Sequence, residues 1–197
     1  MTRKKFIPYI IGGAILLILV IWIITSYNSL VGKQEKMQNQ WNEIQNTYQR
    51  RLDLIPNLVS IVKGVSDFEQ TTLVQITEAR SKAMNSLSND ELTPENYQNQ
   101  KKLQDAVSAN VSRLLIRVES YPELKGTEAY RGLQTQLEGT ERRIAIARKD
   151  FNAAVADYNR KVRSFPTSII SGIFGFKKKT GFQADAGTEN AGEVKFK

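Results

Sequence analysis

The feature that most constrains the fold of this chain is an uncharged apolar run, Phe6 to Ile24, that leads directly into a helical pattern. Its length of about 19 residues, at a rise of about 1.5 Å per residue, is just enough to cross a hydrocarbon core of about 30 Å. Tyr9, Trp22 and Tyr27 stand near its ends, where aromatic side chains favour the membrane interface. The run exceeds the apolar core of a signal peptide and no small-residue cleavage site follows, so a retained anchor is favoured over a cleaved leader.

The distribution of basic residues also favours a membrane protein. Three basic residues at positions 3–5 precede the apolar run, and Lys33 and Lys36 follow it, so the positive-inside rule keeps the N-terminus in the cytoplasm and exports the rest. The net charge of +8 gathers beside apolar segments, with five lysines from Lys177 onward, and not on one helix face. Charge in that position favours an anionic lipid surface and argues against nucleic-acid binding.

The composition excludes most kinds of catalytic site. The 197 residues include no histidine and no cysteine. Histidine is the commonest general base and metal ligand, and cysteine supplies thiolate nucleophiles and ligands. The sequence also has no glycine-rich phosphate loop, nucleophile elbow or calcium loop. We therefore expect no catalytic activity, no cofactor and no metal ion.

Beyond residue 26 the apolar positions recur three, four or seven residues apart, and no segment sustains the period of two that marks a strand. This pattern predicts four long helices. The residues that bound them are Ile55 at the end of the first, Leu87 at the end of the second, Thr93 and Pro94 at the start of the third and Pro122 after it, and Thr127 and Pro166 around the fourth. A turn is predicted at Ser88–Asn96.

Long helices with short connections pack antiparallel, as in helical bundles and coiled coils. The predicted fold class is therefore all-α: an N-terminal transmembrane helix that continues into an elongated antiparallel bundle of long helices, with an irregular C-terminal tail. The corresponding division is a membrane anchor at residues 1–26, a bundle at 27–166 and an apolar, lysine-rich tail at 167–197.

Charged residues and a proline interrupt the first helix within the stretch WNEIQNTYQRRLDLIPNLVSIVKG, at Arg50, Arg51, Asp53, Pro56 and Asn57. Because proline lacks a backbone N–H and clashes with the carbonyl four residues before it, the helix is predicted to end or kink at Pro56, with Asp53 capping a new start. A kink is favoured over a reversal of the chain, since no polar, glycine-rich loop follows. The arginines either bind a phosphate or carboxylate ligand or tie this joint to the fourth helix, and the second reading is favoured.

The fourth helix carries the polar residues that such a joint would contact. Glu141, Asp150 and Asp157 are carboxylates available to one of the arginines. Asn152 and Asn159 stand seven residues apart and share one helix face. Polar residues at such positions can fix the register of partner helices, and that role is the one we expect for the two asparagines.

The tail opens with SIISGIFGF at residues 168–176, followed by three lysines at 177–179. The apolar residues of this segment, which are the predicted contact residues, are Ile169, Ile170, Ile173, Phe174 and Phe176. Such a segment either caps the end of the bundle core or lies on a membrane surface or a neighbouring bundle. The sequence leaves both readings open.

Four stretches of the chain resemble the LemA family, in the family's order. They are YNSLV at 27–31, WNEIQNTYQRRLDLIPNLVSIVKG at 41–64, ITEARSKA at 76–83 and ERRIAIARKDFNAAVADYNRKVRSFPTSIISGIFGF at 141–176. The resemblance implies a bacterial protein of the cytoplasmic membrane, with a single N-terminal membrane helix and an elongated helical domain. It implies no established enzymatic activity and assigns no chemical role to these residues.

The expected function is therefore that of a structural or interaction protein. Slender helices with polar residues in their apolar stripes leave surface for other subunits, and a membrane anchor concentrates copies in two dimensions. We expect a self-assembling scaffold whose partners are the lipid bilayer and further copies of the chain. The alternative is a membrane-bound adaptor or sensor for another membrane protein, such as an envelope-stress component or a membrane protease.

Overall fold

The structure is a computed structural model that describes residues 3–64, 69–87 and 92–182, with side chains from residue 9 onward. The described residues form six helices and no strand. The helices are α1 (Arg3–Lys63), α2 (Gln70–Leu87), α3 (Pro94–Val118), α4 (Pro122–Lys125), α5 (Glu128–Arg163) and α6 (Thr167–Phe174). The predicted all-α class, with a long apolar N-terminal helix that continues into a bundle, is confirmed.

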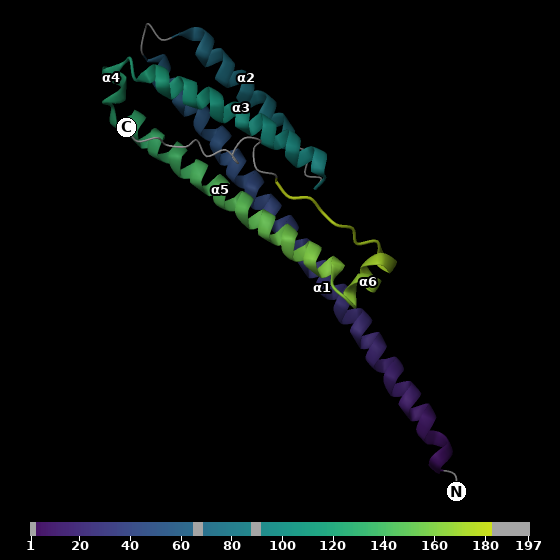
Figure 1. The fold of residues 1–197 in the computed structure, drawn as a ribbon. Helices are drawn as coiled ribbons and strands as arrows, with labels where there is room; N and C mark the ends of the chain where they lie inside the picture. Colours follow the sequence, from purple (N-terminus) through teal and green to yellow (C-terminus); the bar gives the residue numbers. More distant parts are fainter. Residues whose placement is uncertain (1–2, 65–68, 88–91, 183–197) are drawn as a thin grey trace, which may run out of the picture.

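The molecule is built on α1, whose 61 residues extend for about 90 Å. The first part of α1 projects alone from the bundle, and the remainder packs side by side with the antiparallel α5 (Figure 1). Helices α2 and α3 form a hairpin against the far part of this pair, and α6 lies where α1 leaves the bundle (Figure 1). The bundle is therefore held away from the N-terminus by one unbroken helix.

The projecting part of α1 is the candidate membrane span. Among the described residues, α1 is the one helix that is long and apolar enough to cross a membrane. Most of its side chains from Tyr9 to Ile24 are apolar and exposed. An exposed apolar surface of this length fits a segment that faces lipid, because in water it would favour aggregation.

The core consists of three clusters along the bundle axis, named here by their distance from the span. The proximal cluster contains Leu30, Tyr158, Val162 and Ile170. The middle cluster includes Trp41, Tyr48, Tyr97, Phe151 and Val155, and the distal cluster includes Leu52, Leu58, Ile76, Leu114 and Leu133. Helices α1 and α5 contribute to all three clusters, whereas α2 and α3 contribute mainly to the distal cluster, and α3 adds Tyr97 to the middle one.

The predicted break at Pro56 is wrong, because α1 continues through this residue. Proline leaves the carbonyl of Leu52, four residues earlier, without its helical donor. Arg80 of α2 replaces that donor, with its Nε 2.8 Å from the Leu52 oxygen. Asp53 does not cap a new helix but lies within α1, where its Oδ1 accepts a hydrogen bond from Gln49 Nε2 at 2.8 Å.

The favoured kink is wrong as well, because the chain reverses after Lys63. Helix α2 packs back against α1, and its Leu73 and Ile76 lie in the distal cluster with Leu58 of α1. The reversal includes Gly64, whereas residues 65–68, which were expected to continue the second helix, lie outside the described residues. The predicted end of that helix at Leu87 is confirmed.

The predicted caps of the later helices are confirmed. The Thr93 side chain accepts a hydrogen bond from the Asn96 backbone N–H at 3.3 Å, and Thr127 accepts one from Tyr130 at the same distance. Residues 88–91 of the predicted turn lie outside the described residues. Two short helices, α4 and α6, were not predicted. Helix α6 lies in the part of the chain that was expected to be irregular.

The Arg80–Leu52 hydrogen bond predicts a coupling between Arg80 and Pro56. Arg80→Met leaves the Leu52 carbonyl without a donor and should lower the free energy of unfolding by about 1–2 kcal/mol. In a Pro56→Ala chain the new backbone N–H can bond this carbonyl, so the same change should cost less than half as much. Urea unfolding of the four chains of this cycle, followed by circular dichroism, measures the coupling. Equal costs in both backgrounds would contradict this explanation.

Candidate functional site

Arg51 is the joint residue that links three helices. Its side chain is buried, with a residue exposure of 2%. Arg51 Nη1 donates to the main-chain oxygen of Gln104 on α3 at 3.0 Å and to the side-chain Oε1 of the same residue at 3.3 Å. Arg51 Nη2 donates to Glu141 Oε2 on α5 at 2.5 Å. Glu141 is one of the three carboxylates that the sequence offered as partners.

Arg148 of α5 makes the complementary set of contacts. Its Nε donates to the hydroxyl of Tyr48 on α1 at 3.0 Å, and its Nη2 donates to Asp105 Oδ1 on α3 at 3.1 Å. The two arginines therefore start from different helices, and both reach α3. Arg148 was not among the residues predicted from the sequence. The available signal was its position seven residues after Glu141, which places the two on one face of α5.

The other residues of the predicted joint do not converge on Arg51. Arg50, Asp53, Pro56 and Asn57 are all exposed on α1. Of the other two carboxylates that the sequence offered as partners, Asp150 is exposed. Asp157 lies 3.7 Å from Lys33 Nζ and 3.3 Å from Arg160 Nη1. The structure thus brings together Arg51 and Glu141 and leaves the rest of the set dispersed.

The arginine contacts form a polar layer between the middle and distal clusters. Burial lowers the pKa of Arg51, and the negative charge of Glu141 opposes this shift. Burial also raises the pKa of Tyr48, which favours its neutral hydroxyl. Because Nη1 and Nη2 of Arg51 and Nε and Nη2 of Arg148 donate to protein acceptors, this layer supports a role in setting helix register, although Arg51 Nε is buried without a partner among the described residues.

A second polar arrangement lies on the face of α5 that carries the two asparagines. Asn159 pairs with the backbone of Lys179, donating from Nδ2 to the carbonyl at 2.7 Å and accepting the N–H at 2.8 Å. Asn152 pairs with Phe182 in the same way, at 3.1 and 2.8 Å. The expected role of these asparagines between helices is therefore wrong. They bind residues 177–182, which we call the tail segment. The surface formed by Tyr97 of α3 and by Asn152, Tyr158 and Asn159 of α5 holds this segment, and we call that surface the tail groove.

The spacing of the asparagines explains why each finds a backbone partner. Seven helical residues advance by about 10.5 Å, and three extended residues advance by about 10 Å. The two side-chain amides therefore coincide with residues 179 and 182 of an extended chain. Two further hydrogen bonds to main-chain carbonyls come from the hydroxyl of Tyr158 to Lys177, at 3.0 Å, and from Tyr97 to Thr180.

Close packing also explains the glycine in the tail segment. A Cβ at Gly181 would lie 2.5 Å from Asn152 Oδ1, the atom that accepts the Phe182 N–H. Any larger residue must therefore displace the amide or the segment. The hydrogen bonds and this contact make the backbone of the tail segment the part that the groove recognises.

The side chain of Phe182 ends the tail segment in an aromatic box. Its ring centre lies 6.2 Å from Trp41 of α1, 5.3 Å from Tyr97 of α3 and 5.5 Å from Phe151 of α5. The guanidinium carbon of Arg148 lies 5.5 Å from the same ring. Tilted and edge-to-face ring pairs and a cation over the ring stabilise such contacts beyond their buried area. Arg148 thereby connects the polar layer to the tail groove.

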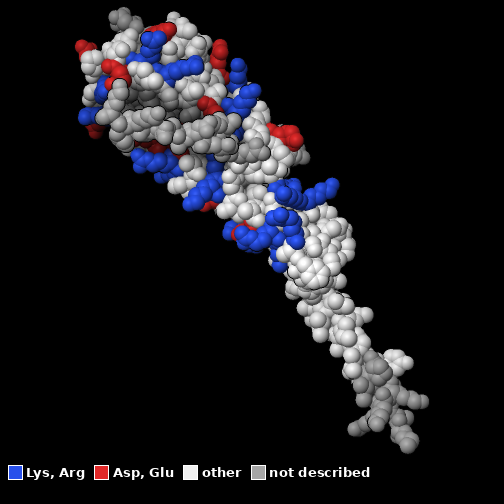
Figure 2. Space-filling view, viewed as in Figure 1, with Lys and Arg blue, Asp and Glu red and all other residues white. Residues whose placement is uncertain are grey.

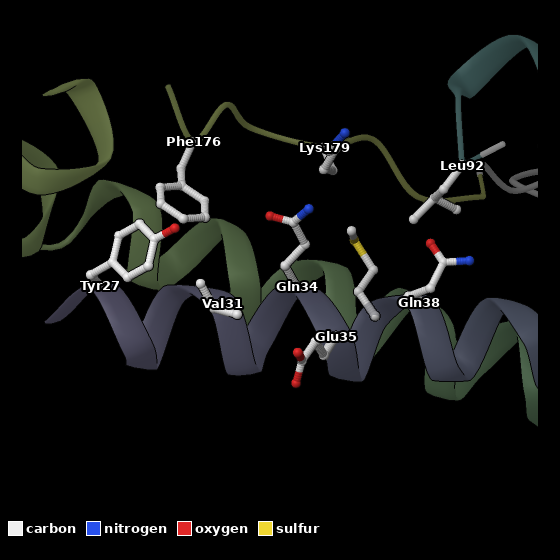
Figure 3. A pocket seen from close by; sticks show the side chains of 9 residues that line it. Tyr27, Val31, Gln34, Glu35, Gln38, Leu92, Phe176 and Lys179 are labelled. Carbon is white, nitrogen blue, oxygen red and sulfur yellow. The ribbon is translucent and has the colours of Figure 1, made fainter. Parts of the chain in front are cut away.

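A pocket of about 560 Å³ lies between α1 and the tail segment. Figure 3 shows Gln34 and Gln38 pointing from α1 toward the tail, with Tyr27 and Phe176 at one end and Leu92 at the other. The tail forms one side of this pocket. The tail segment is thus bonded firmly to α5 and stands partly clear of α1.

The predicted tail residues divide between the core and the surface. Ile170 is buried in the proximal cluster, and Phe176 packs against Tyr27 with ring centres 5.6 Å apart. Ile169, Ile173 and Phe174 are exposed. Ile170 thus caps the core, which is one of the two readings that the sequence left open. The remaining three are largely exposed, although Phe174 also packs against Tyr27. The tail beyond residue 182 lies outside the described residues.

Comparisons with known proteins agree with this architecture. The model of the LemA family matches residues 40–196. Protein LemA of Metamycoplasma hominis is 27% identical over 157 residues, covering 80% of this chain and 68% of the relative. Magnetosome protein MamQ 2 of Paramagnetospirillum magneticum is 25% identical over 179 residues, covering 82% and 66%. The chain therefore spans about two thirds of the length of these relatives. Because the family model covers most of its length, the chain belongs to the LemA family.

Proposed function

We propose that this chain is a membrane-anchored scaffold without catalytic activity, and that copies of it associate through the tail groove. The observation that carries the proposal is the pairing of Asn152 and Asn159 with the backbone of residues 182 and 179. A surface that binds an extended segment through its main chain is a protein-binding surface. It performs no reaction on what it holds.

Exchange of the tail segment between copies would preserve every contact that the groove makes. The hydrogen bonds and ring contacts of residues 177–182 do not depend on which copy supplies the segment. Gly175, in the left-handed region with φ of 76°, ends α6 just before the segment and is suited to act as a hinge. Swapping of identical elements is a low-cost route to oligomers, and anchoring in one membrane raises the local concentration of copies.

The polar layer also supports a scaffold function. Arg51 and Arg148 are directed at protein acceptors on neighbouring helices and hold α3 on the α1–α5 pair. These two guanidinium groups therefore serve to hold the helices of the bundle together. A rigid bundle with a groove for a peptide segment fits a scaffold.

Photo-crosslinking from position 182 tests the proposal. A benzoylphenylalanine in place of Phe182 keeps an aromatic ring in the box and reacts with whichever chain surrounds it. We express this variant together with an unmodified chain of different tag length in the same membrane. The expected product joins the two chains and carries crosslinks in the groove, near Trp41, Tyr97 or Phe151. The same experiment with Asn152→Ala and Asn159→Ala in the unmodified chain should lose this product.

The outcomes separate this function from the alternative. A membrane-bound adaptor is the second candidate, because a groove that reads the backbone can also accept an extended segment of another protein. A benzoylphenylalanine in place of Tyr97, within the groove, that crosslinks to a different protein in stoichiometric amount would favour the adaptor. Crosslinks confined to single chains would contradict association through the tail groove.

A further inference from the structure

Helix α6 has one face in the core and also carries apolar side chains that are largely exposed. The buried face contains Thr167, Ile170 and Ser171. On the opposite side, Ile169 and Ile173 are 51% and 70% exposed, and Phe174, at the C-terminal end of the helix, is 52% exposed. Three exposed large apolar side chains on a helix of two turns are unfavourable in water.

This apolar face lies at the level where the candidate membrane span ends. The ring of Phe174 contacts that of Tyr27, with centres 5.0 Å apart, and Trp22 packs against the cluster that contains Ile170. Figure 2 shows an uncharged surface that continues from the narrow part of α1 onto the base of the bundle. The face of α6 is therefore continuous with the surface that the span presents to lipid.

Basic residues border the same face. Arg160, Lys161 and Arg163 occupy the last turn of α5, just before α6. Lysines 177–179 follow α6 after Gly175 and Phe176, and the backbone contacts of residues 177 and 179 with α5 hold them near it. Figure 2 shows lysine and arginine side chains gathered beside the uncharged base. An apolar helix face bordered by basic residues matches the chemistry of an anionic lipid surface.

We propose that α6 is an interfacial helix that lies on the same bilayer that α1 crosses. Ile169, Ile173 and Phe174 enter the headgroup region, and the neighbouring basic residues contact anionic headgroups. The bundle then has two membrane contacts, the α1 span and α6, and these fix its orientation on the membrane. This inference does not depend on whether copies associate through the tail groove.

The absence of native cysteine permits a direct test in the full-length chain. Ile173→Cys places a fluorescent label on the apolar face, and Ile116→Cys places one on α3, far from the span, at a residue that is 68% exposed. Both chains are reconstituted in vesicles of phosphatidylcholine and phosphatidylglycerol that contain spin-labelled lipid. The label at 173 should be quenched by the lipid and protected from aqueous iodide about five-fold relative to the label at 116. Replacing phosphatidylglycerol by phosphatidylcholine should lower the lipid quenching at 173 about two-fold.

Three results would overturn the proposal. Equal access of iodide to both labels would mean that α6 faces water. Protection from iodide without quenching by lipid would mean that a second protein surface, such as another copy, covers α6. Lipid quenching that does not respond to phosphatidylglycerol would remove the role of the basic residues.

Discussion

Arg51→Met is expected to lower the free energy of unfolding by about 3 kcal/mol, the largest effect of any single change in the joint. Methionine retains much of the side-chain volume but removes the donors that reach Gln104 on α3 and Glu141 on α5. The main-chain oxygen of Gln104 is then left without this charged donor in the interior. Urea unfolding of the purified chain, followed by circular dichroism, measures the loss.

Arg50→Met is the matched control, because Arg50 is the adjacent arginine and is exposed on the same helix. Its free energy of unfolding should stay within about 0.5 kcal/mol of the wild-type value. Similar stabilities for the two variants would mean that the contacts of Arg51 do not hold the three helices together. That result would reopen the reading in which the arginines form a ligand site.

Replacing both Asn152 and Asn159 with alanine is expected to release the tail segment. The change removes four hydrogen bonds to the backbone, each with a net contribution of about 0.5–1.5 kcal/mol. Trypsin cleaves after lysine, and the segment begins with three lysines at 177–179. Because cleavage requires the segment to leave the groove, its rate at these lysines should rise by about 30-fold or more.

Asn110→Ala provides the matched control for this experiment. Asn110 lies on α3, is half-buried and bonds only the Ala106 carbonyl of its own helix in the described structure, so its removal should not change the cleavage rate at the tail. Gly181→Ala changes the tail segment instead of the groove, because the Cβ of the new alanine would meet Asn152 Oδ1. It should accelerate cleavage as the asparagine variants do. Unchanged cleavage rates in both kinds of variant would contradict binding of the tail backbone by the groove.

Much of the fold follows from patterns that are local in sequence. The apolar stripes, the Thr93 and Thr127 caps and the prolines near the helix ends act through neighbours within one or two turns. They identified the later helices correctly. Pro56 was misread for the same reason, because the donor that satisfies Leu52 comes from Arg80, 28 residues away. Local rules describe the backbone hydrogen bond that a proline removes, but they do not reveal that a side chain distant in sequence supplies the missing donor.

The candidate site shows a similar division. The sequence placed Asn152 and Asn159 on one face of a helix and offered Glu141 as a partner for an arginine. It did not identify what the asparagines bind, because the tail segment is extended and irregular and therefore has no period to detect. The aromatic box was equally hidden, since Trp41, Tyr97 and Phe182 come from three distant parts of the chain.

Light scattering of the full-length chain, extracted from its membrane in mild detergent, tests the central claim most directly. The proposed scaffold predicts a protein mass of at least two chains for the wild type. It also predicts a smaller mass for the Asn152→Ala, Asn159→Ala variant, with the helical signal in circular dichroism unchanged. A wild-type protein that is monomeric, or a variant that keeps the wild-type mass, would contradict association through the tail groove.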